Sequence, residues 1–138
     1  MNAEQFIEVL KIQTSDAAVR SLATNLPSDY SGKNLHAARM SESFKKLPKD
    51  ARTLVLEIAK EAAELAVFNF LAVIDGEKVM EYTESKGEFE LYFVKDGVRV
   101  LLNSDASPAL HHLYVSETKI AALEDTEPPA DPIRDTPS

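Results

Sequence analysis

The chain has 138 residues, a length that suits one compact domain built around a single hydrophobic core. It contains no cysteine, so disulfides, thiolate metal sites and cysteine nucleophiles are excluded together. The formal net charge of -8 argues against a nucleic-acid-binding protein, because such a domain normally carries a clustered positive surface. We therefore expect a protein partner with a basic surface, no nucleic acid and no cofactor.

The N-terminal half of the chain is expected to be mainly helical. Residues 1–5 lack the basic start and apolar segment of a signal peptide, which predicts a cytoplasmic protein. Ser15 is placed to cap a second helix that ends at Leu26-Pro27. Loop residues follow at 28–33. Apolar residues at helical spacing predict the first helix (Phe6, Ile7, Val9 and Leu10), and residues 35–47 predict a third.

The strongest pattern extends from Pro48 to Ile74 and predicts one long helix that stops at Asp75-Gly76. Pro48 suits the first helical position, because the backbone donor that it lacks is not needed there. From Leu65 to Ile74 the one polar residue is Asn69, so this half should be surrounded by protein, with Asn69 tied to a neighbouring loop or strand. Apolar residues with the helical period predict a buried face along the segment: Leu54, Val55, Ile58, Ala59, Ala62, Leu65 and Ala66. The charged residues between them are expected to face water: Arg52, Glu57, Lys60, Glu61 and Glu64.

A second interpretation of this segment stays open. Residues 67–74 are also rich in strand-forming side chains, and Asp75-Gly76 is a frequent hairpin turn, so the helix could stop near Leu65 and a strand follow. A membrane-spanning segment is not expected, because the uncharged run is about half of the roughly 20 residues needed to cross a bilayer.

After Gly76 the pattern changes to short strands. A two-residue turn at Asp96-Gly97 makes two apolar faces coincide, with Phe93 opposite Val100, whereas a three-residue turn would place Arg99 beside Phe93. The two-residue turn is therefore favoured. Two segments of alternating polar and apolar residues predict the hairpin, 88–94 and 98–103, and residues 77–83 are a candidate edge strand.

Ser107-Pro108 predicts the start of a last helix, which should pack on the sheet. This order predicts an α+β fold: N-terminal helices with one long central helix, a small antiparallel sheet built on a β-hairpin, and a C-terminal helix. We assign residues 1–123 to this single compact domain. Residues 124–138 are expected to form an acidic, proline-rich flexible tail.

No sequence motif in the chain indicates a particular reaction. Residues 31–34 lack the upstream glycine and the Ser or Thr of a phosphate-binding loop. His111 and His112 are adjacent, so on a regular helix they point about 100° apart and are poorly placed to share one metal ion. Glu88 and Glu90 form a candidate carboxylate pair, but glutamates are also expected on the solvent-exposed face of a sheet without any catalytic role. We predict no catalytic residue and no metal site.

The outer face of the hairpin is the candidate partner-binding surface. Aromatic and arginine side chains beside aliphatic groups and carboxylates are typical of protein interfaces, although a covering helix would explain this face equally well. The candidate residues are Glu88, Glu90, Tyr92, Arg99 and Leu101. An alternative pocket between the long helix and the sheet would be lined by Asn69, His111, His112 and Tyr114.

Three segments of the C-terminal half together resemble small bacterial proteins of unknown function: residues 86–91 (KGEFEL), 97–103 (GVRVLLN) and 110–114 (LHHLY). These segments are turns and core positions, so the resemblance implies no activity.

Acidity, compact size and a missing catalytic constellation favour a small acidic cytoplasmic protein-binding module. Such a module would occlude its partner, as immunity proteins, antitoxins and phage-encoded inhibitors do. Two alternatives stay open. One is a small-ligand-binding domain or enzyme with a pocket between the long helix and the sheet, and the other is a structural homo-oligomer subunit such as a homodimer.

Overall fold

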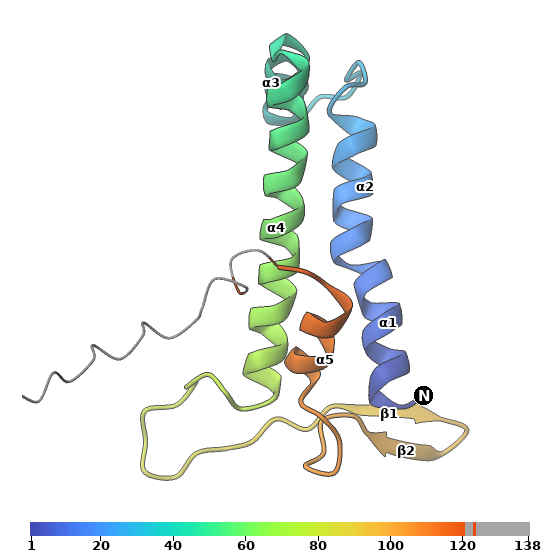
Figure 1. Cartoon of the computed structure of the whole chain (residues 1–138), viewed down its shortest axis with the longest axis vertical. Helices are drawn as coiled ribbons and strands as arrows, with labels where there is room; N and C mark the ends of the chain where they lie inside the picture. Colours follow the sequence, from blue (N-terminus) through green and yellow to red (C-terminus); the bar gives the residue numbers. More distant parts are fainter. Residues whose placement is uncertain (121–122, 124–138) are drawn as a thin grey trace, which may run out of the picture.

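The computed structural model describes residues 1–120 and residue 123. The predicted acidic tail, residues 124–138, lies outside the described residues. Long and short helices with one two-stranded antiparallel sheet confirm the α+β class (Figure 1). In chain order the elements are α1 (Ala3–Gln13), α2 (Ser15–Asn25), α3 (Leu35–Lys46), α4 (Lys49–Ile74), β1 (Tyr92–Lys95), β2 (Val98–Leu101) and α5 (Leu110–Glu117).

α1 and α2 follow one another along nearly one line, and α4 lies beside them in the opposite direction (Figure 1). A break at Thr14 separates the two short helices, where the hydroxyl of Thr14 donates to the carbonyl of Leu10 at 2.6 Å. Thr14 occupies the N-cap of α2 without a side-chain cap bond. Ser15 is therefore the first residue of α2 and not its cap, which corrects its predicted role.

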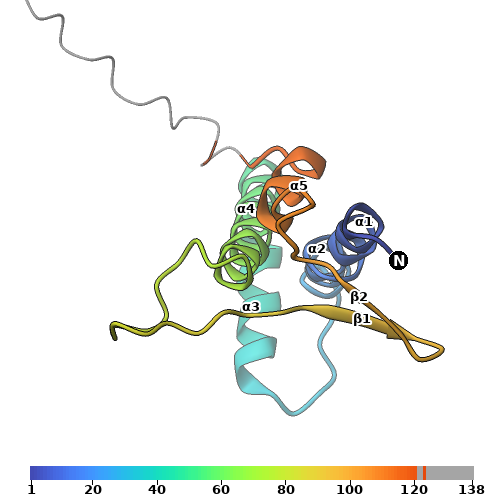
Figure 2. The same ribbon diagram turned by 90° about the horizontal axis from the view of Figure 1, so that it is seen from below.

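α3 begins after Asn34, whose side-chain oxygen accepts from the backbone N–H groups of His36 and Ala37 at 3.0 and 3.2 Å. It lies across the far end of the long helix rather than beside it (Figure 2). The buried hydroxyl of Ser41 is 2.9 Å from the carbonyl oxygen of Leu26 and joins α3 to the end of α2.

α4 is one continuous helix, so the alternative strand at residues 67–74 does not form. Pro48 is its N-cap, with extended backbone, and not its first helical residue as predicted. The C-terminus explains the stop: Gly76 has φ +79°, which glycine adopts without steric cost. The backbone N–H of Gly76 donates to the carbonyl of Val73 at 3.1 Å, and that of Glu77 donates to the carbonyl of Ala72 at 2.9 Å. This is a Schellman motif, which provides hydrogen-bond donors for carbonyls in the last turn of the helix.

The hairpin has the predicted register, with Phe93 opposite Val100 across a two-residue turn. Asp96 and Gly97 have φ +51° and +78°, the positive values that such a turn requires at both central positions. The strands are shorter than predicted, and residues 77–83 form no strand among the described residues. They belong to a long loop that leaves the end of α4 and returns at β1 (Figure 1).

α5 begins at Leu110, two residues after the predicted first helical position at Pro108. It lies between α1 and the C-terminal half of α4, and so packs on helices instead of on the sheet as predicted (Figure 2). The start of α5 is determined by a residue that is distant in the sequence. Asp75, at the end of α4, accepts from the backbone N–H of His111 at 2.8 Å, so its carboxylate satisfies the first turn of α5.

The hydrophobic core sits at the end of the molecule where α1, α4, α5 and the base of the hairpin meet. Its buried members are Ala3, Ile7, Leu71, Leu102, Leu110, Tyr114 and Ile120. One expectation for α4 is wrong. Ala66, Asn69 and Phe70 are exposed, so residues 65–74 are not surrounded by protein. The strands extend away below the start of α1 and do not lie along the helix (Figures 1 and 2).

Candidate functional site

The outer face of the hairpin brings four of the five predicted partner-binding residues together. The guanidinium of Arg99 lies over the ring of Tyr92, with its carbon 4.1 Å from the ring centre. The Tyr92 hydroxyl donates to Glu90 at 3.2 Å, and Leu101 is the cross-strand neighbour of Tyr92. Glu88 is exposed but lies apart from this set, at an open cavity. We call Glu90, Tyr92, Arg99 and Leu101 the hairpin cluster.

The tip of the hairpin exposes apolar side chains on both of its faces. Val94 lies on the same face as the hairpin cluster and is 58% exposed, and Val98 on the other face is 64% exposed. Exposed valines at a projecting tip contribute little to the stability of the monomer, because more than half of each residue remains in contact with water. They are available to a partner.

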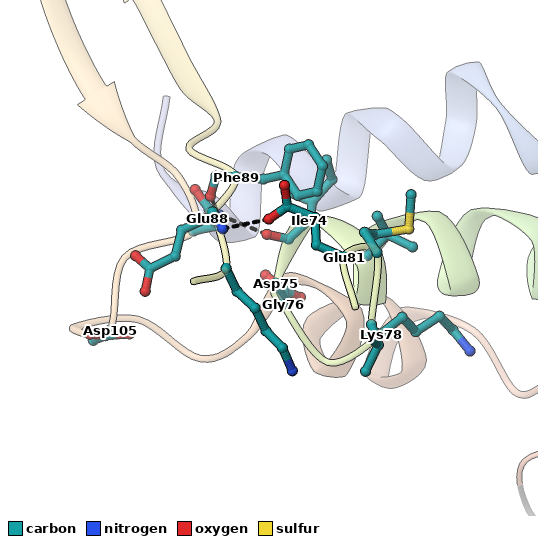
Figure 3. A pocket seen from close by; sticks show the side chains of 14 residues that line it. Ile74, Asp75, Gly76, Lys78, Glu81, Glu88, Phe89 and Asp105 are labelled. Atoms are coloured by element: carbon teal, nitrogen blue, oxygen red, sulfur yellow. Dashed lines mark hydrogen bonds between the residues drawn. The ribbon is translucent and has the colours of Figure 1, made fainter. Parts of the chain in front are cut away.

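An open cavity of about 730 Å³ lies at the C-terminal end of α4, under the long loop that follows it (Figure 3). Side chains of both charges line it, among them Lys78, Lys86, Glu88 and Asp105. The carboxylate of Glu81 accepts from the backbone N–H of Gly87 at 2.7 Å and so joins two parts of the middle of the loop (Figure 3). Mixed charges and a wide opening give this cavity no preference for an anion or a cation.

The four residues of the predicted alternative pocket do not line this cavity. Two of them are exposed and two are buried, although the ring centres of His111 and His112 lie 4.1 Å apart. Asn69 is exposed on α4 and His112 is exposed on α5. His111 is buried, with its Nδ1 at 2.7 Å from Asp75 and its ring edge-on to Phe68. The contacts of His111 are those of a residue that fixes the start of α5 to the end of α4.

Tyr114, the fourth member, is fully buried and donates its hydroxyl to Ser15 at 2.8 Å. Burial raises the pKa of Tyr114, and the Ser15 hydroxyl opposes this by bonding to it. The bond joins α5 to the start of α2 across the core. Tyr114 therefore serves as a buried connection between helices.

Glu64 is a buried carboxylate that sequence reasoning counted among the wet residues of α4. It is 3% exposed, and burial raises its pKa because the charged form is poorly solvated. Lys60 and Lys11 oppose the shift, while Glu61 and Asp16 add to it. Its partners come from three helices, so Glu64 belongs to the packing between α4 and the α1–α2 pair.

The predicted buried face of α4 is largely exposed. Leu54, Ile58 and Val55 are 54%, 59% and 37% exposed. The apolar repeat was visible in the sequence, but its assignment to the core was wrong, because α2 and α5 pack on other faces of the helix. The exposure of this apolar surface is the feature of α4 that the sequence pattern did not predict.

Among residues 1–120 and 123, no group of three or more His, Asp or Glu side chains could hold a metal ion. In the same residues, no helix is long and apolar enough to cross a membrane. No protein-family model, curated protein or solved structure matches the chain. Its function is therefore inferred from the geometry of its own surfaces.

Proposed function

We propose that this protein is a small acidic binding module whose hairpin contacts a basic surface of a partner protein and occludes it, as inhibitors of the immunity-protein or antitoxin type do. The observation that carries the proposal is the hairpin cluster on a projecting hairpin. Arg99 stacks on Tyr92, and Tyr92 bonds to Glu90 in the free molecule. Tyrosine and arginine are among the side chains that supply most of the binding free energy in protein interfaces, and the exposed valines add apolar contact area.

The cluster is arranged before any partner binds. Long side chains usually lose about 0.5 to 1.5 kcal/mol each in conformational freedom when an interface forms. Arg99 and Tyr92 already constrain one another, so less of that cost remains at binding. The net charge of -8 would speed association with a basic partner and orient the encounter, with the apolar tip supplying contact area.

Affinity capture from lysate of the source cell tests the proposal. Immobilised wild-type protein is compared with a Tyr92→Ala/Arg99→Ala variant and with a control, Arg39→Ala/Thr53→Ala, which removes two exposed side chains from α3 and α4. Wild type and control should retain one basic protein, and the hairpin variant at least about tenfold less. Retention should fall as NaCl rises from roughly 50 to roughly 500 mM, because screening weakens attraction between opposite charges.

Two outcomes contradict the proposal. One is that wild type retains no protein at the lower salt concentration. The other is that the hairpin variant and the control retain the same protein equally, which would place the binding surface elsewhere. Circular dichroism of each variant shows that the comparison is made between folded proteins.

A further inference from the structure

A second open cavity, of about 300 Å³, lies near the N-terminal end of α4, where residues of α2, α3 and α4 meet (Figure 2). Two basic side chains from the first turns of α4, Lys49 and Arg52, line it together with apolar groups. Phe44 is buried, so the cavity combines a fixed apolar wall with two cationic side chains. The apolar residues that line it are Ala23, Pro27, Phe44 and Leu56.

Arg52 is the residue that points to a ligand. Its Nε is buried, and among residues 1–120 and 123 no group accepts a hydrogen bond from it. Of the side chains that are not exposed in this part of the chain, Arg52 is the one with a buried polar atom left unpaired. A buried donor without an acceptor is destabilising, and more so when the group is charged. An acceptor from outside the chain can reach Arg52 through the cavity that it lines.

Two of the three acidic residues in segment 27–53 are already paired with other cations. Asp29 binds Lys45 at 2.6 Å, and Glu42 binds Lys46 at 3.1 Å. The segment contains six basic side chains against these three acidic ones, although the whole chain carries a net charge of -8. This end of the molecule is therefore locally positive and attracts anions.

The first turn of α4 adds to the positive field at the cavity. Pro48 provides no side-chain cap for the first backbone N–H groups, and the helix dipole is positive at this end. Lys49 and Arg52 are three residues apart and so lie on one face of the helix. Asp50, in the same turn, is exposed and does not line the cavity. One anion in the cavity can therefore contact the ammonium and the guanidinium groups together.

We infer that this cavity binds a small carboxylate with an apolar body, and that Arg52 and Lys49 hold its head group. The planar guanidinium presents parallel N–H donors, Nε among them, that match the two oxygens of a carboxylate. The apolar wall at Phe44 suits a ring or a short hydrocarbon better than a fully hydrated anion such as phosphate. A volume of about 300 Å³ is at the lower end for ligand sites, which limits the ligand to roughly one substituted ring.

Titration of the isotopically labelled full chain with sodium benzoate, followed by NMR at constant ionic strength, tests the inference. Amide signals of Phe44, Lys49 and Arg52 should shift and saturate, with a dissociation constant of roughly 0.1 to 10 mM for so small a ligand. Benzamide has the same ring without the charge and should bind at least about tenfold more weakly. Inorganic phosphate should also bind at least about tenfold more weakly, because it has no apolar body.

Three variants separate the guanidinium from general charge. Arg52→Met removes the guanidinium but keeps an apolar stem, so it should weaken benzoate binding at least about tenfold. Arg52→Lys keeps the charge without the planar fork and should bind with intermediate affinity. Arg39→Met is the same change at an exposed position of α3 that does not line the cavity, and it should bind like wild type.

Thermal denaturation distinguishes binding from a structural role of Arg52. Saturating benzoate should raise the melting temperature of wild type but not of Arg52→Met. Without ligand, Arg52→Met should melt at or above the temperature of wild type, because the buried Nε has no partner within the described residues. A structural role would lower the melting temperature of this variant, and that result would contradict the inference.

Other results would also overturn it: no saturable shifts at the cavity, equal affinity for benzoate and benzamide, or equal binding by Arg52→Met and Arg39→Met. Phosphate binding as tight as that of benzoate would overturn the assigned class of ligand. The Tyr92→Ala/Arg99→Ala variant should bind benzoate normally, so this inference and the proposed function fail independently.

Discussion

The side chain of Asn103 joins backbone groups from two distant parts of the chain. Its oxygen accepts from Leu91 N–H at 2.8 Å, and its nitrogen lies 2.7 Å from the carbonyl of Phe89 and 3.1 Å from that of Ile74. One amide thus fixes the base of the hairpin to the end of α4. Without it, half-buried backbone groups would lose their partners.

Replacing Asn103 by Ala should therefore lower the free energy of unfolding by about 1 to 3 kcal/mol, the usual cost of leaving buried polar groups unsatisfied. Urea denaturation followed by circular dichroism measures the change. Asn69→Ala is the matched control, because that amide is exposed on α4 and its removal should change stability by less than about 0.5 kcal/mol. Equal losses in both variants would contradict the role given to Asn103.

Glu64 should make the molecule less stable as the pH rises. Its pKa is raised above 4.5 in the folded state, chiefly by burial, so the folded chain holds this proton more tightly than the unfolded chain. The contribution to unfolding free energy is fully present below pH 4.5 and is lost as the pH passes through the raised pKa. Lys60, Lys11, Glu61 and Asp16 face the carboxylate and modulate the shift.

Glu64→Gln removes this titration while keeping the shape of the side chain. At pH 7 the variant should be more stable than wild type by on the order of 1 kcal/mol, and the gain should shrink toward low pH. Thermal denaturation across this pH range measures both effects. Glu57→Gln, the same change at an exposed position of α4, should leave the transition almost unchanged. A pH-independent gain at position 64 would mean that desolvation is not the cause.

At the scale of elements, the hairpin depends on its turn. Gly97 has φ +78°, so an added Cβ is strained there although no neighbouring atom lies within 4 Å of it. Gly97→Ala should destabilise the hairpin by roughly 1 to 2 kcal/mol. Gly87→Ala is the control, because its Cβ would meet only Glu81 at 3.5 Å, an ordinary contact, with no positive φ. Amide hydrogen exchange in β1 reports the difference, and equal loss of protection in the two variants would refute it.

The elements that could be predicted are those with local signals. The turn at Asp96-Gly97 and the stop at Gly76 depend on backbone angles that the neighbouring residues themselves require, and both were placed correctly. The start of α5 was misplaced because its first turn is satisfied by Asp75, a residue far away in the sequence. The local sequence at residues 107–110 gives no indication that Asp75 is the partner.

The face that α4 presents to the core could not be predicted for a related reason. Periodicity shows that a helix has an apolar stripe, but it does not show which molecule covers that stripe. Ile58 was assigned to the core and is 59% exposed, whereas Glu64 was read as wet and is 3% exposed. Of the candidate site, the hairpin cluster followed from strand register, while the exposed apolar side of α4 depends on the packing of the whole chain.

At the scale of the whole molecule, buried apolar residues are concentrated at one end. The core cluster joins α1, the end of α4, α5 and the base of the hairpin. At the opposite end Phe44 is the one buried apolar side chain among the described residues, and it sits apart from that cluster. The far end should therefore open more easily than the end that holds the core, because less apolar surface opposes its opening.

Native-state hydrogen exchange can measure this difference in local stability between the two ends of the molecule. In dilute protein, amides of Leu71 and of α5 should exchange through global unfolding, whereas those of α3 and the first turns of α4 should be at least roughly 100-fold less protected. Uniform protection along α4 in dilute protein would show instead that α2 and α4 alone hold the far end as firmly as the core holds the other.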